Sequence, residues 1–108
     1  MQITPASIFS GISGSSEGEE FLTLLETSAV RIERIVSHAK SSPDGFWYDQ
    51  PDDEWVMVLR GRATLEIDPS GPVEMGAGDH VFIPRHIRHR VAATTADTIW
   101  LAVHLKSE

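Results

Sequence analysis

The chain has 108 residues, with 16 acidic against nine basic side chains and a formal net charge of −7. This length accommodates one domain with a hydrophobic core, but not two. The acidic balance disfavours nucleic acid as a partner, because its phosphates would be repelled. The absence of cysteine excludes disulfides and thiolate chemistry. No run approaches about 18 apolar residues and no signal pattern opens the chain, so we expect a cytoplasmic protein without a membrane partner.

The N-terminal part predicts an extended arm followed by one short helix. Apolar residues stand singly among proline, serine and glycine at Ile3, Ile8, Phe9 and Ile12. Ser16 then precedes Glu19 by three positions, which is the spacing of a helix capping box. Apolar residues follow at helix-compatible spacing, at Phe21, Leu22, Leu24 and Leu25. We therefore expect a helix over residues 17–26, within an N-terminal segment of residues 1–27.

From residue 28 onward, short apolar or alternating runs separated by turns predict β-strands. The expected strands cover residues 28–37, 55–60, 63–67, 73–75, 80–83, 91–94 and 98–105, with a shorter extended piece at 46–48. In the last strand the alternation places Trp100, Ala102 and His104 on one face. No helix stands between consecutive strands, so the pattern predicts an antiparallel sandwich or small barrel over residues 28–108, within a single domain.

Residues at fixed spacing give the chain a resemblance to the cupin family. Glu54, six residues and Gly61 match the end of the first cupin motif, G-x5-H-x-H-x(3 or 4)-E-x6-G. Gly78, five residues, Pro84 and then His89 match the second motif, G-x5-P-x-G-x2-H-x3-N. The chain is similar in particular to small single-domain bacterial cupins. The resemblance implies an all-β jelly-roll barrel, also called a double-stranded β-helix, whose motif residues bind a divalent metal.

The chain departs from the first motif where the family places its two histidines. In one register Tyr48 and Gln50 occupy these positions, and in the other Trp47 and Asp49 do. The leading glycine of the first motif is absent in both registers. In the second motif, His86 stands where the family has glycine. The resemblance therefore implies a degenerate metal site.

The motif residues that remain are candidate metal ligands. Gln50, Glu54 and His89 offer an amide oxygen, a carboxylate and an imidazole. This donor set suits iron, manganese, nickel or zinc. In the other register Asp49 takes the place of Gln50. We prefer Gln50, because Asp49 would share a strand face with the bulky Trp47.

Aromatic and polar side chains around this site are candidates for binding a small organic ligand, since such pockets combine apolar walls with few polar groups. The candidate ligand-binding residues are Trp47, Tyr48, Gln50, His89 and Trp100. Tyr48 and His86 are also candidates for a catalytic acid or base, although we favour a turn position for His86. His104 is expected to be a core or dimer-interface histidine rather than a ligand.

Two functions agree with these features. In the first, the barrel binds a small organic ligand and keeps a degenerate divalent-metal site. In the second, a metal-dependent enzyme of oxygenase, isomerase or lyase type acts on a small oxygenated substrate. The loss of both first-motif histidines favours the first, whereas Glu54 and His89 favour the second. We prefer the first and leave catalysis open. The apolar strand, the arm and the tryptophan-rich ends also predict a homodimer.

Overall fold

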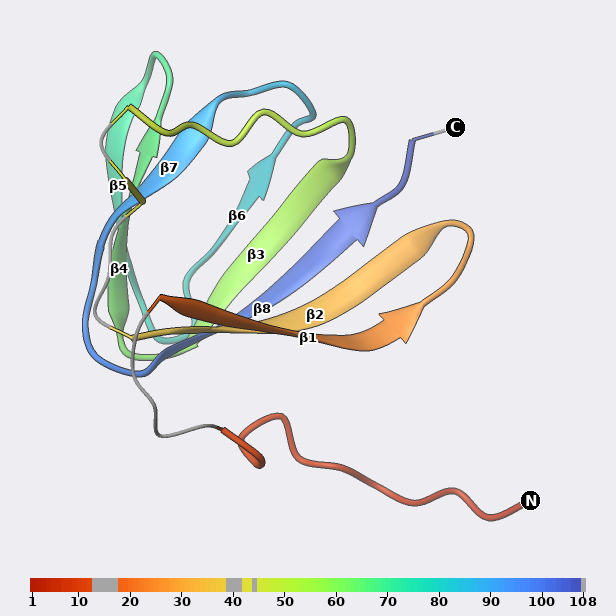
Figure 1. The fold of residues 1–108 in the computed structure, drawn as a ribbon. Coiled ribbons are helices and arrows are strands. Elements are labelled where there is room, and N and C mark those ends of the chain that lie inside the picture. Colours follow the sequence, from red (N-terminus) through yellow and green to blue (C-terminus); the bar gives the residue numbers. More distant parts are fainter. Residues whose placement is uncertain (13–17, 39–41, 44, 108) are drawn as a thin grey trace.

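The computed structural model describes residues 1–12, 18–38, 42–43 and 45–107, which form two antiparallel sheets (Figure 1). The larger sheet has the strand order β1-β2-β8-β3-β6 and the smaller sheet the order β5-β4-β7. None of the described residues belongs to a helix with the length and apolar character that membrane crossing needs. The strands are β1 (Glu19–Glu26), β2 (Val30–Ser37), β3 (Asp53–Arg60), β4 (Arg62–Ile67), β5 (Gly71–Gly76), β6 (His80–Ile83), β7 (His89–Thr94) and β8 (Thr98–Leu105).

The predicted all-β jelly roll is confirmed. Strands β6 and β8 have the predicted bounds, and the other strands from β2 onward differ by a few residues at their ends. The alternation of apolar residues was informative because each strand buries one face between the sheets. The extended piece at residues 46–48 contributes a single bridge, in which Tyr48 pairs with His89.

The predicted helix over residues 17–26 is wrong. Its residues from Glu19 onward form β1, which pairs antiparallel with β2 and has a bulge between Thr23 and Leu25. Residue 17 and Ser16 of the expected capping box lie outside the described residues. An isolated helix of this length is marginal in water, whereas the edge of β2 offers a full row of backbone hydrogen-bond partners. Pairing with β2 therefore overrides the local helical pattern.

The core lies between the two sheets. The large sheet contributes Val56, Val58, Ile83, Trp100 and Ala102. The small sheet contributes Ala63, Leu65, Met75 and Val91. Six of the described ionisable side chains are buried, and four of these six line one pocket, namely Glu33, Glu54, His89 and His104. Burying such groups is costly unless they are paired, so their partners indicate where the functional site lies.

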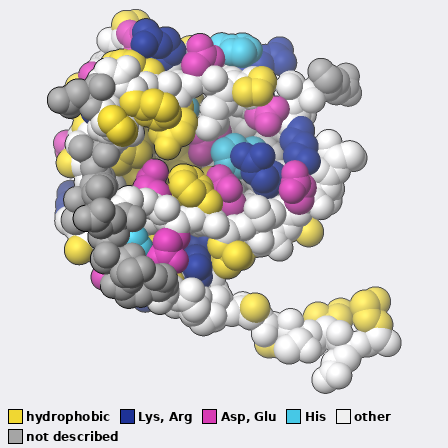
Figure 2. Space-filling view, in the orientation of Figure 1, with side chains coloured by type: hydrophobic (Ala, Val, Ile, Leu, Met, Phe, Trp, Pro, Cys, Tyr) yellow, Lys and Arg dark blue, Asp and Glu magenta, His cyan; other side chains and the backbone are white. Residues whose placement is uncertain are grey.

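The N-terminal arm leaves the barrel and carries apolar side chains away from the body of the molecule (Figure 1 and Figure 2). The guanidinium of Arg34 donates to the carbonyl oxygens of Ile8 and Ser10, at 3.2 and 2.6 Å. These bonds attach the end of the arm to β2. Met1 and Ile3, nearer the N-terminus, are fully or almost fully exposed.

Candidate functional site

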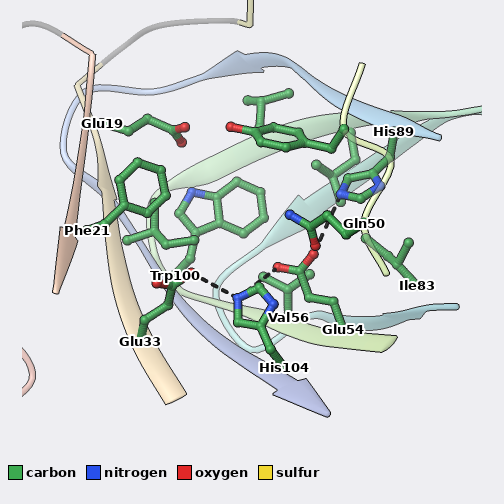
Figure 3. A pocket seen from close by; sticks show the side chains of 14 residues that line it. Glu19, Phe21, Glu33, Gln50, Glu54, Val56, Ile83, His89, Trp100 and His104 are labelled. Atoms are coloured by element: carbon green, nitrogen blue, oxygen red, sulfur yellow. Dashed lines mark hydrogen bonds and ion pairs between the residues drawn. The ribbon is translucent and has the colours of Figure 1, made fainter. Parts of the chain in front are cut away.

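A pocket of about 500 Å³, part of it open to solvent, lies between the two sheets (Figure 3). Aromatic and aliphatic side chains form most of its wall. Three carboxylates, two imidazoles, one amide and one phenol supply its polar groups. This combination of an apolar wall and a small polar cluster is the arrangement expected of a ligand-binding site.

The register of the large sheet brings Glu54 and His104 together. Glu54 on β3 lies directly opposite His104 on β8, and opposite residues of an antiparallel pair share a face. Both side chains therefore point inward, and both are buried. The Nε2 atom of His104 lies 2.9 Å from a carboxylate oxygen of Glu33 on β2 and 3.9 Å from Glu54. One imidazole is thus held by two carboxylates.

His89 enters the pocket from the small sheet. Its backbone exchanges two hydrogen bonds with Tyr48, at 2.7 and 3.1 Å, and the two rings stack with their centres 5.5 Å apart. The Nε2 atom of His89 lies 3.5 Å from Glu54 Oε1. Glu54 therefore lies between the two buried imidazoles.

The other ring nitrogen of His89 fixes its tautomer. Nδ1 lies 3.0 Å from the carbonyl oxygen of Ile87, and a carbonyl only accepts, so Nδ1 carries the hydrogen. A neutral His89 then presents the lone pair of Nε2 to Glu54. Burial disfavours charge on this ring, but the Glu54 carboxylate and the Ile87 carbonyl outweigh it and raise the pKa of His89.

Gln50 adds a third acceptor to the same corner. Its Oε1 atom is buried without a hydrogen-bond partner, and Figure 3 shows the amide beside Glu54 and His89. An amide oxygen, a carboxylate and an imidazole lone pair therefore converge. Such a group of acceptors is unfavourable in a buried site unless a cation or a proton lies among them.

The opposite wall of the pocket is held by a chain of hydrogen bonds. The indole N–H of Trp100 donates to the hydroxyl of Ser37 at 3.0 Å, and this hydroxyl donates to Glu19 at 2.8 Å. Burial, together with the carboxylates of Glu19 and Glu54, raises the pKa of Tyr48 to about 12. The phenol therefore stays protonated at neutral pH and acts as a hydrogen-bond donor.

These residues fit a divalent metal by their donor chemistry. Among the described residues, no group of three or more histidine, cysteine and carboxylate side chains is placed to hold a metal ion. Gln50 supplies an amide oxygen instead, and that oxygen is unpartnered. Glu54 supplies a charged carboxylate, and His89 supplies an Nε2 atom with a free lone pair. The hydrogen bond from Nδ1 to a backbone carbonyl orients the His89 ring, as is common for metal-ligating histidines.

The family model for the cupin domain matches residues 32–104. The chain belongs to the cupin family. No curated protein matches the sequence. Solved structures share the fold. A Ralstonia eutropha protein, for which a mannose-6-phosphate isomerase activity has been suggested, is 42% identical with a TM-score of 0.91, over 97% of this chain and 100% of that protein.

Two further solved structures are more distant. A cupin superfamily protein from Desulfitobacterium hafniense is 19% identical with a TM-score of 0.80, and the match covers 98% of this chain and 94% of that protein. A cupin superfamily sugar phosphate isomerase from Silicibacter pomeroyi is 25% identical with a TM-score of 0.67. The match covers 83% of this chain and 60% of that isomerase. The first of these two likenesses shows the fold alone.

In this cupin, most of the sequence-predicted site residues meet in one pocket. The predicted residues that line it are Tyr48, Gln50, Glu54, His89 and Trp100. Trp47 is not among the lining residues, and the guanidinium of Arg88 lies 5.1 Å from its ring centre. His86 is also outside the lining, in a positive-φ turn, with its exposed ring 2.8 Å from Asp49. The residues at 48 and 50 thus face the interior of the cupin barrel.

Sequence reasoning missed three ionisable residues of the cupin pocket. Glu33 lies within the predicted strand of residues 28–37 without a predicted role, and His104 was expected in the core or at an interface. Glu19 fell within the predicted helix. The sequence did contain one indication for His104, because strand alternation places it on the same face as Trp100, which was a predicted pocket residue. Nothing in the sequence alone indicated that β2 and β8 are neighbours, and the bond between Glu33 and His104 joins residues 71 positions apart.

Proposed function

We propose that this cupin binds a small organic ligand in its pocket, beside a divalent metal ion held by Gln50, Glu54 and His89. The observation that carries the proposal is the convergence of three acceptors at one buried corner. When bound, the ion would act as a Lewis acid on an oxygen of the ligand. The protonated Tyr48, which lines the same pocket and stacks on His89, would contact the ligand as a hydrogen-bond donor.

A proton alone explains this corner less well than a metal. A hydrogen on Nε2 of His89 faces Glu54 at 3.5 Å, which is longer than a good hydrogen bond. It also leaves Oε1 of Gln50 without a partner. A divalent ion accepts electron pairs from all three groups at once.

Metal content tests the proposal directly. The full chain is purified without an affinity tag or chelator, incubated with iron, manganese, nickel or zinc in turn, desalted and measured by elemental mass spectrometry. We expect close to one equivalent of at least one metal in the wild type. Glu54→Gln and His89→Gln should lose it. His80→Gln, an equal change at an exposed histidine on β6, should keep it.

Two results would contradict the metal site. One is a wild-type protein that takes up none of the four metals. The other is a Glu54→Gln variant with the same metal content as the wild type. Circular dichroism of each variant shows whether a loss of metal follows from a loss of fold, because the all-β spectrum should be retained.

A second candidate function is proton transfer of the isomerase or lyase type. The observation that favours it is the buried pair of His104 and Glu33 beside Glu54, since an imidazole held by a carboxylate suits general acid–base work. The isomerase names of the Ralstonia and Silicibacter proteins agree with this class of reaction.

Proton exchange separates this candidate from simple binding. Ligands that bind the metal-loaded protein are incubated in D2O and followed by NMR for deuterium uptake at carbon. If the protein is an enzyme of this type, the wild type should exchange a ligand proton and His104→Gln should bind without exchange. A wild type that binds its ligand and exchanges nothing would exclude the enzymatic function for that ligand.

We also propose that the protein is a homodimer, formed through the outer face of the large sheet. Opposite residues form an apolar row across four strands, at Ile32, Val103, Trp55 and Phe82. Phe82 is 54% exposed. The arm leaves its own barrel with Met1 and Ile3 exposed, so a second copy on this face would cover both the row and the arm.

Light scattering coupled to size exclusion tests this dimer. We expect the wild type to have the mass of two chains and Phe82→Glu the mass of one. Ser70→Glu adds the same charge at an exposed turn away from this sheet and should remain dimeric. A monomeric wild type, or a Phe82→Glu variant that stays dimeric, would contradict the proposed interface.

A further inference from the structure

The pocket continues outward into a second hollow with aromatic walls. This hollow, of about 750 Å³ including open solvent, shares Glu19, Phe21 and Tyr48 with the inner pocket. Phe46 also lines it, and its ring stands edge-on to Tyr48 with the ring centres 4.9 Å apart. The side chains of Phe21 and Phe46 are both exposed to solvent. A ligand that enters the barrel therefore passes Glu19 and three aromatic rings.

The two hollows carry negative charge and no fixed positive charge. Of the described residues that line them, none is lysine or arginine, and three are carboxylates. Among these described lining residues, only the two imidazoles of the inner pocket carry groups that offset the carboxylates.

Glu19 is the carboxylate of this group that has no cationic neighbour among the described residues. Glu33 and Glu54 each face an imidazole. Glu19 instead accepts a hydrogen bond from the hydroxyl of Ser37 and lies beside the phenol of Tyr48, whose pKa it raises. A carboxylate that lines the same hollow as three aromatic rings is a favourable environment for an organic cation, because ring faces and a carboxylate attract the same charge.

We infer that the ligand of this pocket carries an ammonium group, which binds between Glu19 and the rings of Phe21, Phe46 and Tyr48, and that phosphorylated ligands are excluded. The inference rests on the proposed ligand-binding function and specifies the ligand's chemical class. A phosphate would meet three carboxylates, and none of the described lining residues offers a guanidinium or ammonium group to hold it. The sugar phosphates named for similar proteins are therefore poor ligands for this chain.

Calorimetry with matched ligands tests the inference. The probes are choline and its uncharged isostere 3,3-dimethyl-1-butanol, together with mannose 6-phosphate. We expect choline to bind the full chain at least about tenfold more tightly than the isostere, because the two differ only in charge. Mannose 6-phosphate should give no measurable binding.

The variants then locate the cation. Glu19→Gln keeps an acceptor for Ser37 and should lower choline affinity to that of the isostere, while isostere binding stays unchanged. Glu74→Gln removes the same charge from β5, where Glu74 accepts hydrogen bonds from Thr64 on the surface, and should bind choline as the wild type does. Phe21→Leu keeps the charge and should weaken choline binding severalfold, which provides a second variant if Glu19→Gln does not fold.

Three results would overturn the inference: equal affinity for choline and its isostere, no binding of choline, or binding of mannose 6-phosphate. The same samples are assayed for metal. A protein that holds metal and does not discriminate by charge overturns the ammonium site alone. A protein that discriminates by charge and holds no metal overturns the metal site alone.

Discussion

Glu54 and His104 lie directly opposite each other on β3 and β8, and their side chains approach to 3.9 Å inside the barrel. His104 lies closer still to Glu33, at 2.9 Å, and Glu54 faces His89 at 3.5 Å. Carboxylates and imidazoles therefore alternate along one buried row. Each of these groups depends on its neighbour, because a buried ionisable group without a partner is strongly destabilising.

Removing one member of the His104–Glu33 pair should lower the free energy of unfolding by more than removing both members does. His104→Leu leaves the Glu33 carboxylate buried without its imidazole, and we expect the free energy of unfolding to fall by about 3 kcal/mol. The double variant Glu33→Leu/His104→Leu should regain a large part of this loss. Urea unfolding followed by tryptophan fluorescence measures both. A double variant whose loss equals the sum of the two single losses would contradict the pairing.

Ser37 should be a stability determinant of the pocket wall although it carries no charge. Its fully buried hydroxyl accepts from Trp100 and donates to Glu19. Ser37→Ala leaves both partners unsatisfied, so we expect a loss of about 1–3 kcal/mol in the free energy of unfolding. Ser70→Ala at an exposed turn should change it by less than about 0.5 kcal/mol. Equal effects of the two changes in chemical denaturation would show that the hydrogen-bond chain contributes little.

The strands from β2 onward were predictable because each has one face toward the core. That alternation is a property of the strand itself and does not depend on its neighbours. Strand β1 was not predictable in this way. Phe21, Leu22, Leu24 and Leu25 are all more than a third exposed, so no buried face distinguishes a strand from a helix there. Pairing with β2 decides the conformation, and the sequence of β1 does not contain that information.

The residues of the candidate site also fall into two groups, those that a single segment predicts and those that depend on how strands are arranged. Glu54 and His89 could be predicted as site residues because each stands at a fixed spacing within its own motif. The inward direction of Gln50 follows from alternation along one segment. The roles of Glu33 and His104 depend on the strand order β2-β8-β3. Strands distant in sequence are brought together by tertiary packing, which a single sequence does not reveal. The pocket's acidic character was missed for this reason.

Gly61, the last residue of the first motif, should be intolerant of a side chain. It has a φ of +90°, and a Cβ atom built there would lie 2.5 Å from the Thr98 hydroxyl oxygen. Gly71 has a similar φ of +100° with open space around it. Strain at positive φ is of order 1–3 kcal/mol, so Gly71→Ala should lose about that much and Gly61→Ala clearly more. Thermal unfolding of the two variants checks this, and equal losses would exclude a steric role for Thr98.

His38 should make stability depend on pH. Its ring nitrogens lie 2.7 Å from Glu20 and 3.0 Å from Asp97. Carboxylates only accept, so both nitrogens donate when the ring is charged. Glu20 above all, with Asp97, raises the pKa of His38, although burial opposes this. Because the pKa is higher in the folded state, the stabilisation is complete below the unfolded value of about 6.5 and is lost as pH rises through the folded value.

The comparison of wild type with His38→Gln isolates this contribution. Other titrating groups, including His89, are common to both proteins and cancel in the difference. We expect the wild type to exceed the variant in free energy of unfolding by more at about pH 6 than at about pH 9. Added salt should narrow the difference at the lower pH, since the Asp97 side chain is 68% exposed and its charge is screened. A difference that is constant, or that grows with pH, would show that His38 stabilises the fold as a neutral ring.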